Sequence, residues 1–447
     1  MDSAYRTFEF TGFELDGRVL RLGYRFSDGA EPDLRFEEVL RLPSTLDAPN
    51  ASDPAVRRAA QIAHFTFGVS YYKAFCPRHV VAPAVPEVVA QFWDTLYTEG
   101  LGEFYFRNGI DPAGRVSFSR SEEAAEPAPR EAPPRERALV LVGGGKDSVV
   151  AREVLRHAGV ECDAFSLGTA PWIERSAAAM GLRHHVVERT LDRRLFELNA
   201  RGALNGHVPI SACIAAAATL VAVASGYSAV VAANERSADE GNTSVNGVEI
   251  NHQWSKSFRF EQSFRQLTER LLENAPLYLS ILRPLSELSI ARLFTLYPAY
   301  QTAVSSCNKN FRIQQPADEK RWCGQCPKCV FLYLIVAAHA EPDVLLRIFG
   351  SDFLADPENL PLLADLAGVG GMKPFECVGT PVECRAALGR LYVTGRLAPA
   401  TAAWYESRVG VSQKRALAEW ATAMTPAASY PLPEAWQSRL DAYLRAH

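Results

Sequence analysis

The sequence predicts an α/β protein with a doubly wound parallel sheet, a small N-terminal α+β domain and a helical C-terminal region. Three observations support this fold class. Strand and helix patterns alternate through the middle of the chain, as in parallel sheets that carry helices on both faces. Alternating apolar and polar positions fill residues 1 to about 42, which indicates a small antiparallel sheet. Beyond residue 340, apolar residues recur at helical spacing between prolines.

Four segments are expected along the chain. A proline-rich, charged stretch between Ser121 and Arg137 lacks large apolar residues, so it cannot bury enough surface to fold and predicts a linker. The predicted boundaries are 1–118 for the N-terminal α+β domain, 119–137 for the flexible linker, 138–340 for the parallel-sheet domain and 341–447 for the helical C-terminal region.

The composition is that of an ordinary globular protein, with 48% apolar and 22% charged residues. A formal net charge of -4 argues against a long nonspecific nucleic-acid surface. The sequence has neither a run of about 18 apolar residues nor an apolar N-terminal segment for secretion. We therefore expect a cytoplasmic protein with no nucleic-acid or membrane partner.

The N-terminal sheet is predicted to continue into helices near Ala55–Thr66 and Pro86–Tyr97. Between them, residues 68–77 combine polar-tipped aromatic side chains with Lys73 and Cys76. Both residues are chemically able to transfer protons, which makes them candidate catalytic residues. The alternative is a core segment whose tyrosine hydroxyls reach the surface.

A glycine-rich turn joins the first strand of the predicted parallel sheet, Ala138–Val142, to a helix that includes Val149–Leu155. Glycines allow a close approach to an anion, and the first amides of a helix have no partners within it. The turn is therefore a candidate phosphate site, and the alternative is an ordinary strand-to-helix turn. Its candidate binding residues are Gly143, Gly144, Gly145, Lys146, Asp147 and Ser148.

Further strands and helices follow the glycine turn. Ligands of open parallel sheets bind at the carboxyl ends of the strands, so we expect Ser166 near adenine and Asn234 near phosphate and metal. The predicted strands are Cys162–Leu167, His185–Val187 and Ala229–Ala233, and the predicted helices are Ile173–Met180, Arg193–Ala200 and Ile210–Ala224.

The segment from Asn234 to Ser257 is rich in polar residues and poor in aliphatic ones. A long polar connection inside a compact domain is more often a binding loop than a solvated one. Mg²⁺ prefers one or two carboxylates together with substrate phosphates, which makes Asp147, Glu235 and Asp239 candidate ligands. His252, in the same segment, is a candidate catalytic residue.

Four cysteines are grouped near the end of the parallel-sheet domain. Cys307 is followed after fifteen residues by Cys323, Cys326 and Cys329 at two-residue gaps. Four thiolates suit tetrahedral Zn²⁺, and a closed site of this kind has a structural role. The alternative is an iron-sulfur cluster, which usually has a different spacing.

The run Gly143–Ser148 resembles the Ser-Gly-Gly-x-Asp-Ser loop of the PP-loop ATP pyrophosphatase superfamily, whose members split ATP into AMP and pyrophosphate. A Walker-type loop is excluded because Asp147, and not serine or threonine, follows Lys146. The match departs at Gly143, where the superfamily has serine, so one hydroxyl donor is lost. The resemblance implies an adenine nucleotide alpha hydrolase-like sheet.

Residues 138 to 340 are also similar to 7-cyano-7-deazaguanine synthase, in which four cysteines bind zinc. The loops Asn234–Asn242 and Asn251–Lys256, residues 70–77 and residues 370–379 extend the resemblance to nearly the whole chain. With them, the chain resembles the UDP-N-acetyl-alpha-D-muramoyl-L-alanyl-L-glutamate epimerase family.

Membership of this family implies an isomerase that inverts the terminal L-glutamate of UDP-MurNAc-L-Ala-L-Glu. It also implies consumption of ATP with Mg²⁺, release of AMP and pyrophosphate, and coupling to the ligase that adds L-glutamate to UDP-MurNAc-L-Ala. Proton exchange on two faces of a carbon needs an acid and a base. Cys377, Cys76, Lys73 and His252 are the candidates, and ordinary buried cysteines remain the alternative for Cys377 and Cys76.

Two other functions remain open from the sequence. One is a different adenylating PP-loop enzyme that forms a nitrile or an amide. The other is a non-catalytic zinc and nucleotide-binding module whose loop has lost its first serine. After the cysteines, the sequence predicts helices at Val330–Ala340, Asp343–Phe349, Val382–Tyr392, Gln413–Met424 and Glu434–Leu444.

Overall fold

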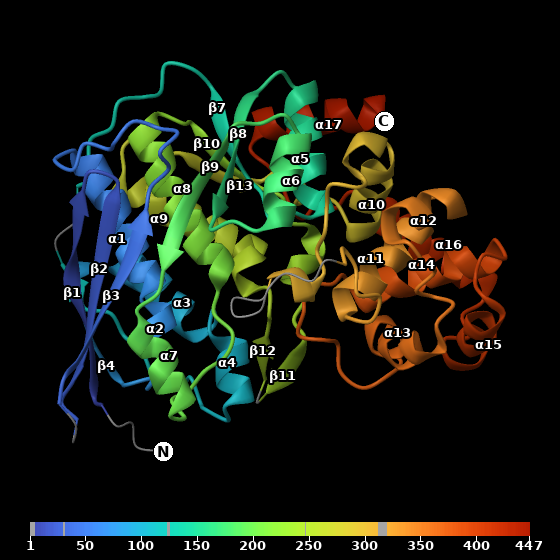
Figure 1. The fold of residues 1–447 in the computed structure, drawn as a ribbon, viewed down its shortest axis with the longest axis horizontal. Helices are drawn as coiled ribbons and strands as arrows, with labels where there is room; N and C mark the ends of the chain where they lie inside the picture. The colour runs from blue at the N-terminus through green and yellow to red at the C-terminus, as the bar shows by residue number, and fades with distance from the viewer. Residues whose placement is uncertain (1–4, 30–31, 123–125, 246, 312–319) are drawn as a thin grey trace.

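A nine-stranded sheet organises the computed structural model, which describes residues 5–29, 32–122, 126–245, 247–311 and 320–447 (Figure 1). In order across the sheet, its strands are β13 (Leu277–Ser280), β10 (Ala229–Ala232), β7 (Arg137–Leu141), β8 (Glu161–Leu167), β9 (His184–Thr190), β3 (Leu34–Arg41), β2 (Val19–Ser27), β1 (Thr7–Asp16) and β4 (His79–Val81).

The strands from β13 to β9 are parallel, as the alternating pattern predicts. The predicted strands are confirmed as β7, β8, β9 and β10. β13 is not predicted from the sequence, because the mostly apolar run Leu277–Leu282 is too short for periodicity to separate strand from helix. β10 and β13 lie on one side of β7 and β8 on the other, so the strand order reverses beside β7.

The two faces of the parallel strands pack into different cores. Along β7, Leu139 joins the core that contains α1 (Pro54–Phe67), α8 (Ile210–Ser225) and α9 (Phe258–Leu271). Val140 joins the opposite core, which contains α5 (Lys146–His157) and α10 (Glu287–Thr295). Helices on both faces are therefore confirmed, and they leave the carboxyl ends of the strands as the place for a ligand.

The expected antiparallel strands near the N-terminus are confirmed as β1, β2 and β3. They do not form a separate sheet, because β3 pairs with β9 in antiparallel register, with Val39 opposite Thr190. An edge strand carries unpaired backbone groups, and this pairing satisfies those of both edges. The remaining elements of this part are α2 (Val69–Tyr72), β5 (Val85–Pro86), α3 (Glu87–Thr98), α4 (Gly102–Arg107) and β6 (Arg120–Ser121).

The segment predicted to be a linker contacts the rest of the chain where it is described; its residues 123–125 lie outside the described residues. Ala128 forms an isolated bridge with Leu272. The Arg130 guanidinium donates to the carbonyl of Tyr227 at 2.8 Å. The backbone therefore runs along α8 and α9 before it enters β7.

Of the helices after residue 326, α11, α14 and α16 pack against α10 and α17 packs against α5; α11 to α16 lie on the right of Figure 1 and α17 at the top. The predicted helices are confirmed as α11, α12, α14, α16 and α17, whereas α13 and α15 were not named from the sequence. Their bounds are α11 Pro327–Ala337, α12 Pro342–Phe349, α13 Leu360–Ala367, α14 Pro381–Val393, α15 Pro399–Arg408, α16 Gln413–Met424 and α17 Glu434–Ala446; earlier in the chain lie α6 Pro171–Ala179 and α7 Arg193–Ala200.

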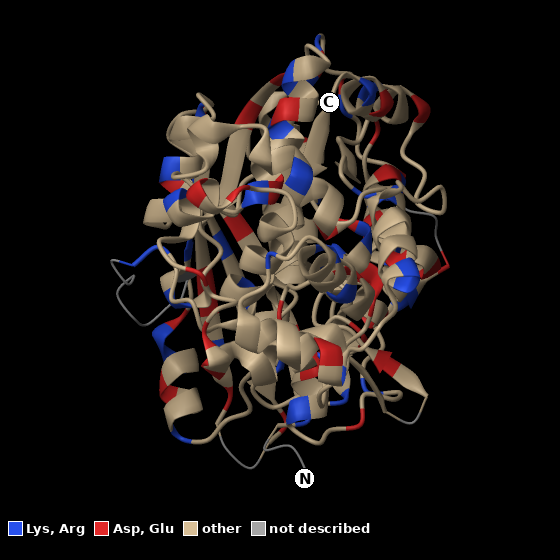
Figure 2. Cartoon of the chain, turned by 90° about the vertical axis from the view of Figure 1, so that its right-hand side faces the viewer, with Lys and Arg blue, Asp and Glu red and all other residues tan. Residues whose placement is uncertain are grey.

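Among the described residues, no helix is both long and apolar enough to cross a bilayer. In Figure 2, the Lys and Arg positions are interspersed with the Asp and Glu positions along the ribbon. With charges mixed in this way, the local electrostatics of a cleft depend on the individual side chains that line it.

Candidate active site

The glycine turn between β7 and α5 lies where the strand order of the sheet reverses. Such a position is the usual ligand crevice of a doubly wound sheet. Gly145 is the extended residue before α5, so Lys146, Asp147 and Ser148 form its first turn. Their amides have no partners within the helix, which makes the turn able to bind an anion.

Gly144 needs to be glycine at this turn. Its φ is +82°, in the left-handed region, and a Cβ would lie 3.2 Å from the carbonyl carbon of Trp172 and 3.3 Å from the nitrogen of Ile173. The chain therefore passes close to the start of α6. The Gly144 carbonyl accepts a hydrogen bond from the amide of Ser305, which brings the loop around Ser306 against the turn.

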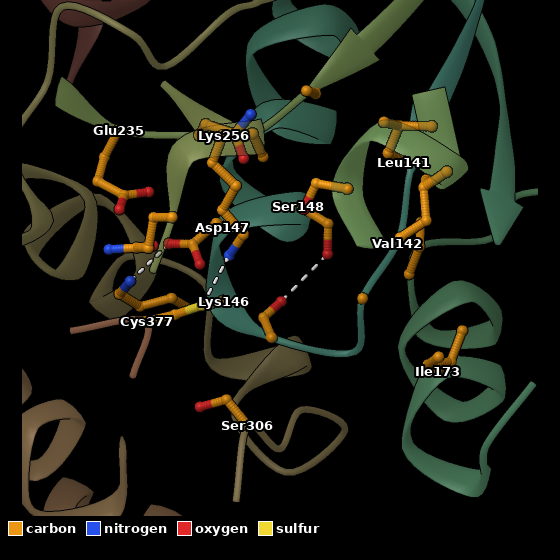
Figure 3. A pocket seen from close by; sticks show the side chains of 18 of the residues that line it. Leu141, Val142, Lys146, Asp147, Ser148, Ile173, Glu235, Lys256, Ser306 and Cys377 are labelled. Carbon is orange, nitrogen blue, oxygen red and sulfur yellow. Dashed lines mark hydrogen bonds and ion pairs between the residues drawn. The ribbon is translucent and has the colours of Figure 1, made fainter. Parts of the chain in front are cut away.

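A cavity of about 280 Å³ opens on the turn, and Figure 3 shows its lining. Residues from the carboxyl ends of β7, β8 and β10 line it, including the predicted Ser166 and Asn234. Segments distant in sequence complete it: Gln253 and Lys256, Glu287 at the start of α10, Lys328 and Phe331 of α11, and Cys377. The three predicted strand ends therefore meet at one cavity, and the C-terminal region closes it.

Lys146 is buried between two carboxylates. Its ammonium donates to Asp147 at 2.5 Å and to Glu287, and its side chain is 4% exposed. Burial alone lowers the pKa of Lys146, but Asp147 and Glu287 outweigh it and raise the pKa. Burial raises the pKa of Glu235, and Lys256 opposes this shift. Glu235 and Asp147 line the same cavity, so two carboxylates are available to a cation there.

Cys377 is held among cations. The ammonium of Lys256 donates to its sulfur at 3.2 Å. Burial alone would raise the pKa of the Cys377 thiol, but Lys256, Lys328 and a hydrogen bond from His252 outweigh it and hold the pKa well below its usual range. These neighbours favour the thiolate form of Cys377, and a thiolate can serve as base or nucleophile.

His252 links Cys377 to a carboxylate that the sequence analysis missed. Its Nδ1 donates to Glu103 Oε2 at 2.5 Å. Burial lowers the pKa of His252, but the hydrogen bonds to Cys377 and Glu103 raise it to about 9. The predicted His252 and Cys377 therefore interact with each other, although 125 positions separate them in the sequence.

Lys73 and Cys76 do not line this cavity. The ammonium of Lys73 donates to Asn205, and burial lowers its pKa to about 8. Cys76 is 1% exposed beside a separate hollow near β4, and burial raises the pKa of its thiol to about 12. A thiol of this kind is a poor base at neutral pH.

Asp239 also lies apart from the cavity. Its Oδ1 accepts the amide of Phe258 at 2.5 Å, at the start of α9, and it borders a different hollow with Tyr430. Ser166 lines the cavity, and its hydroxyl donates to the carbonyl of Gly168 at 2.7 Å. The backbone carbonyl of Asn234 accepts a hydrogen bond from Ser280 of β13 at 2.5 Å.

The sulfurs of Cys307, Cys323, Cys326 and Cys329 converge, all within 4.8 Å of one another. The sulfurs of Cys323 and Cys329 are 3.8 Å apart. A tetrahedral zinc site with Zn–S bonds of about 2.3 Å separates its sulfurs by about 3.8 Å, so the four residues fit this ion. The two-residue gaps between the last three cysteines predicted this convergence. In the structure, Cys326 precedes α11 and Cys329 lies in its first turn.

Sequence reasoning missed Glu103, Glu287 and Lys328. Glu287 follows the unrecognised strand β13, and the rule of strand ends would have included it had that strand been found. Glu103 begins the aromatic run of α4, where only the fold shows that it meets His252. Lys328 lies between Cys326 and Cys329 in the sequence, where the cysteine spacing predicts a metal site and gives no signal for the lysine.

Two family models match the chain. The model described as MurL N-terminal domain matches residues 1–281, and that described as MurL C-terminal domain matches residues 303–423. Three curated relatives are named UDP-N-acetyl-alpha-D-muramoyl-L-alanyl-L-glutamate epimerase. The relative from Xanthomonas oryzae is 40% identical over 86% of this chain and 85% of its own, that from Micromonospora 40% over 81% of each, and that from Salinispora tropica 39% over 86% and 84%.

Proposed function

This chain belongs to the UDP-N-acetyl-alpha-D-muramoyl-L-alanyl-L-glutamate epimerase family, and we propose that it inverts the terminal L-glutamate of UDP-MurNAc-L-Ala-L-Glu through an acyl-adenylate. The family makes it an isomerase that acts on an amino-acid centre. The observation that supports the mechanism is one cavity lined both by the first turn of α5, Lys146–Ser148, and by Cys377.

ATP is the co-substrate in this proposal, and the sheet is of PP-loop type. Gly143, Gly144, Gly145 and Ser148 contact the phosphates, and Lys146 offsets their charge. Leu167, Ile173 and Ile214 supply the apolar side of the cavity, which suits adenine, with Ser166 beside it. Asp147 and Glu235 hold Mg²⁺, which takes one or two carboxylates together with phosphate oxygens.

Adenylation explains why an epimerase uses ATP. Removing the proton alpha to a free carboxylate builds a second negative charge beside the first. Transfer of AMP to the glutamate carboxylate, with release of pyrophosphate, removes the first charge and acidifies the alpha proton. Proton return to the other face and hydrolysis of the adenylate then release the D-glutamyl product and AMP.

Cys377 is our candidate for one of the proton-transferring groups, because it lines the cavity and the ammonium of Lys256 favours its thiolate form. The α C–H electron pair remains on the substrate, and the proton passes to the sulfur. Of the other candidates, His252 interacts with Cys377, whereas Lys73 and Cys76 stand outside the cavity lining.

We also propose that the four clustered cysteines hold a structural Zn²⁺. A reducing compartment suits this site, and none of the nine cysteines forms a disulfide. The enzyme accordingly works in the cytoplasm, in peptidoglycan precursor synthesis. Its substrate comes from the ligase that adds L-glutamate to UDP-MurNAc-L-Ala.

One experiment tests the proposed function. The protein is incubated with UDP-MurNAc-L-Ala-L-Glu, ATP and Mg²⁺, and the glutamate is analysed for chirality while the nucleotide products are identified. We expect D-glutamate, AMP and pyrophosphate. Unchanged L-glutamate would refute the epimerase activity, and ADP in place of AMP would refute adenylation alone.

A further inference from the structure

A buried carboxylate from the N-terminal part of the chain meets the proposed catalytic thiolate through one histidine. Glu103 lies on α4 and is 5% exposed. Its Oε1 accepts a hydrogen bond from Arg107 at 2.6 Å, and its Oε2 accepts one from His252 Nδ1 at 2.5 Å. A buried carboxylate is stable only when it is paired in this way.

The backbone also holds His252 in place. Its amide donates to the side-chain oxygen of Asn242 at 2.9 Å. With Nδ1 directed at Glu103, Nε2 is the ring nitrogen that remains for the hydrogen bond to Cys377. We propose that Glu103 is a positioning residue that holds the protonated imidazole of His252 against the sulfur of Cys377.

Other charged groups around this pair are consistent with a single imidazolium. Burial and the neighbouring His252 lower the pKa of His207 to about 4, and the two imidazole rings are 4.5 Å apart. His207 is therefore neutral beside His252. The remaining titratable or charged neighbours are Arg107 on α4, Lys73 near His207, and Glu376, Lys256 and Lys328 around Cys377.

The proposal predicts that removing the negative charge of Glu103 raises the pKa of Cys377. Without His252 between them, the loss of a nearby negative charge would lower the pKa of a thiol. If Glu103 acts through His252, its removal also deprives the imidazole of its partner, so the imidazolium is lost and the pKa of Cys377 rises. Glu103→Gln keeps the shape of the side chain while it removes the charge, so the direction of the change separates the two effects.

The test measures alkylation of Cys377 by iodoacetamide in the full-length protein, from about pH 5 to pH 9. Tryptic peptide 348–385 carries both Cys377 and Cys384, because the bond between Lys373 and Pro374 resists cleavage. Cys384 is buried with a raised pKa, so it serves as an unreactive internal reference. Fragment masses assign the label to one cysteine or the other.

We expect the apparent pKa of Cys377 to rise by about one unit or more in Glu103→Gln. It should rise at least as much in His252→Gln, and the double variant should show no further rise, because Glu103 acts through His252. Glu87→Gln, on the exposed side of α3 where Glu87 pairs with Arg120, is the control and should leave the profile unchanged. An unchanged or lowered pKa in Glu103→Gln would overturn the proposal.

Two further measurements keep the proposal open to refutation. If Glu103→Gln does not fold, nitrogen NMR of the unaltered protein should show an imidazolium at about pH 8 that is missing from His252→Gln; a neutral ring would contradict the proposal.

Glu103, His207 and His252 also place ligand atoms within 4.8 Å of one another. Loss of one bound metal equivalent in Glu103→Gln would mean that the three residues bind a metal instead.

The catalytic consequence rests on the proposed function, whereas the alkylation profile does not. In Glu103→Gln we expect kcat for epimerisation to fall about tenfold or more, with a smaller change in KM. A protein that shows the predicted alkylation profiles but forms no D-glutamate would refute the proposed function and leave the role of Glu103 intact.

Discussion

The ammonium of Lys256 lies 3.2 Å from the sulfur of Cys377, although the two residues are 121 positions apart in the sequence. Lys256 comes from the polar segment after β10, and Cys377 from the loop between α13 and α14. The contact joins the sheet to the C-terminal region at the cavity. Because the ammonium of Lys256 favours the thiolate form of Cys377, we expect this side chain to transfer a proton in the reaction.

We expect Cys377→Ala to lower exchange of the glutamate alpha proton with deuterated water by about 10²-fold to 10⁴-fold. Pyrophosphate release should persist, because the glycine turn is untouched. Cys76→Ala should retain exchange, since Cys76 stands outside the cavity lining, and Cys162→Ala on β8 is the control. Full exchange in Cys377→Ala would remove this residue as a proton carrier.

Gly144→Ala should weaken ATP binding by about tenfold or more, because the new Cβ meets the backbone of Trp172 and Ile173. Gly159→Ala is a matched control: φ is +68° there, so the backbone strain is similar, but nothing lies within 4 Å of the new Cβ. Calorimetric titration with a nonhydrolysable ATP analogue measures both. Equal effects would show that strain, and not the close approach, accounts for the loss.

Lys146→Met should lower the free energy of unfolding by about 3 to 5 kcal/mol, because it leaves Asp147 and Glu287 facing each other without a cation. The variant Lys146→Met with Glu287→Gln should recover part of that loss, because one buried charge is removed with the lysine. Denaturant unfolding of the two variants tests this. No recovery in the double variant would contradict the pairing of Lys146 with Glu287.

We expect the purified protein to contain about one zinc per chain, with no visible absorption band of an iron-sulfur cluster. Cys323→Ser should lose the metal and unfold at a lower temperature, whereas Cys162→Ser should keep both properties. Elemental analysis and thermal unfolding report the outcome. Iron with visible absorption would favour the alternative cluster.

The charged form of His252 should stabilise the fold in a defined pH range. Its pKa is about 9 in the folded protein and about 6.5 when unfolded, so the stabilisation is complete below pH 6.5 and is lost as the pH rises through 9. The difference in unfolding free energy between the unaltered protein and His252→Gln should therefore shrink by about 2 to 3 kcal/mol between pH 6 and pH 10. A constant difference would mean that His252 is neutral throughout.

Local sequence was sufficient to predict those strands, turns and ligand clusters that are formed by residues close together in the chain. Five apolar residues before three glycines predicted β7 and its turn, and the cysteine spacing predicted the four converging sulfurs. The alternating N-terminal pattern predicted β1, β2 and β3. These features follow from periodicity, glycine chemistry and short ligand spacing, which act within about twenty residues.

The tertiary structure decided which candidates meet. His252 and Cys377 were both named from the sequence, but so were Cys76 and Asp239, and their local patterns were no weaker. Only the fold brings Glu103, His252 and Cys377 together and leaves Asp239 at the start of α9. The sequence by itself determined most strands of the sheet, the glycine turn and the cysteine cluster, whereas the long-range packing of α4 and the C-terminal loop determined the environment of the Cys377 sulfur. The physical reason is that charge state depends on burial and on partners in space, which neighbouring residues in the chain do not specify.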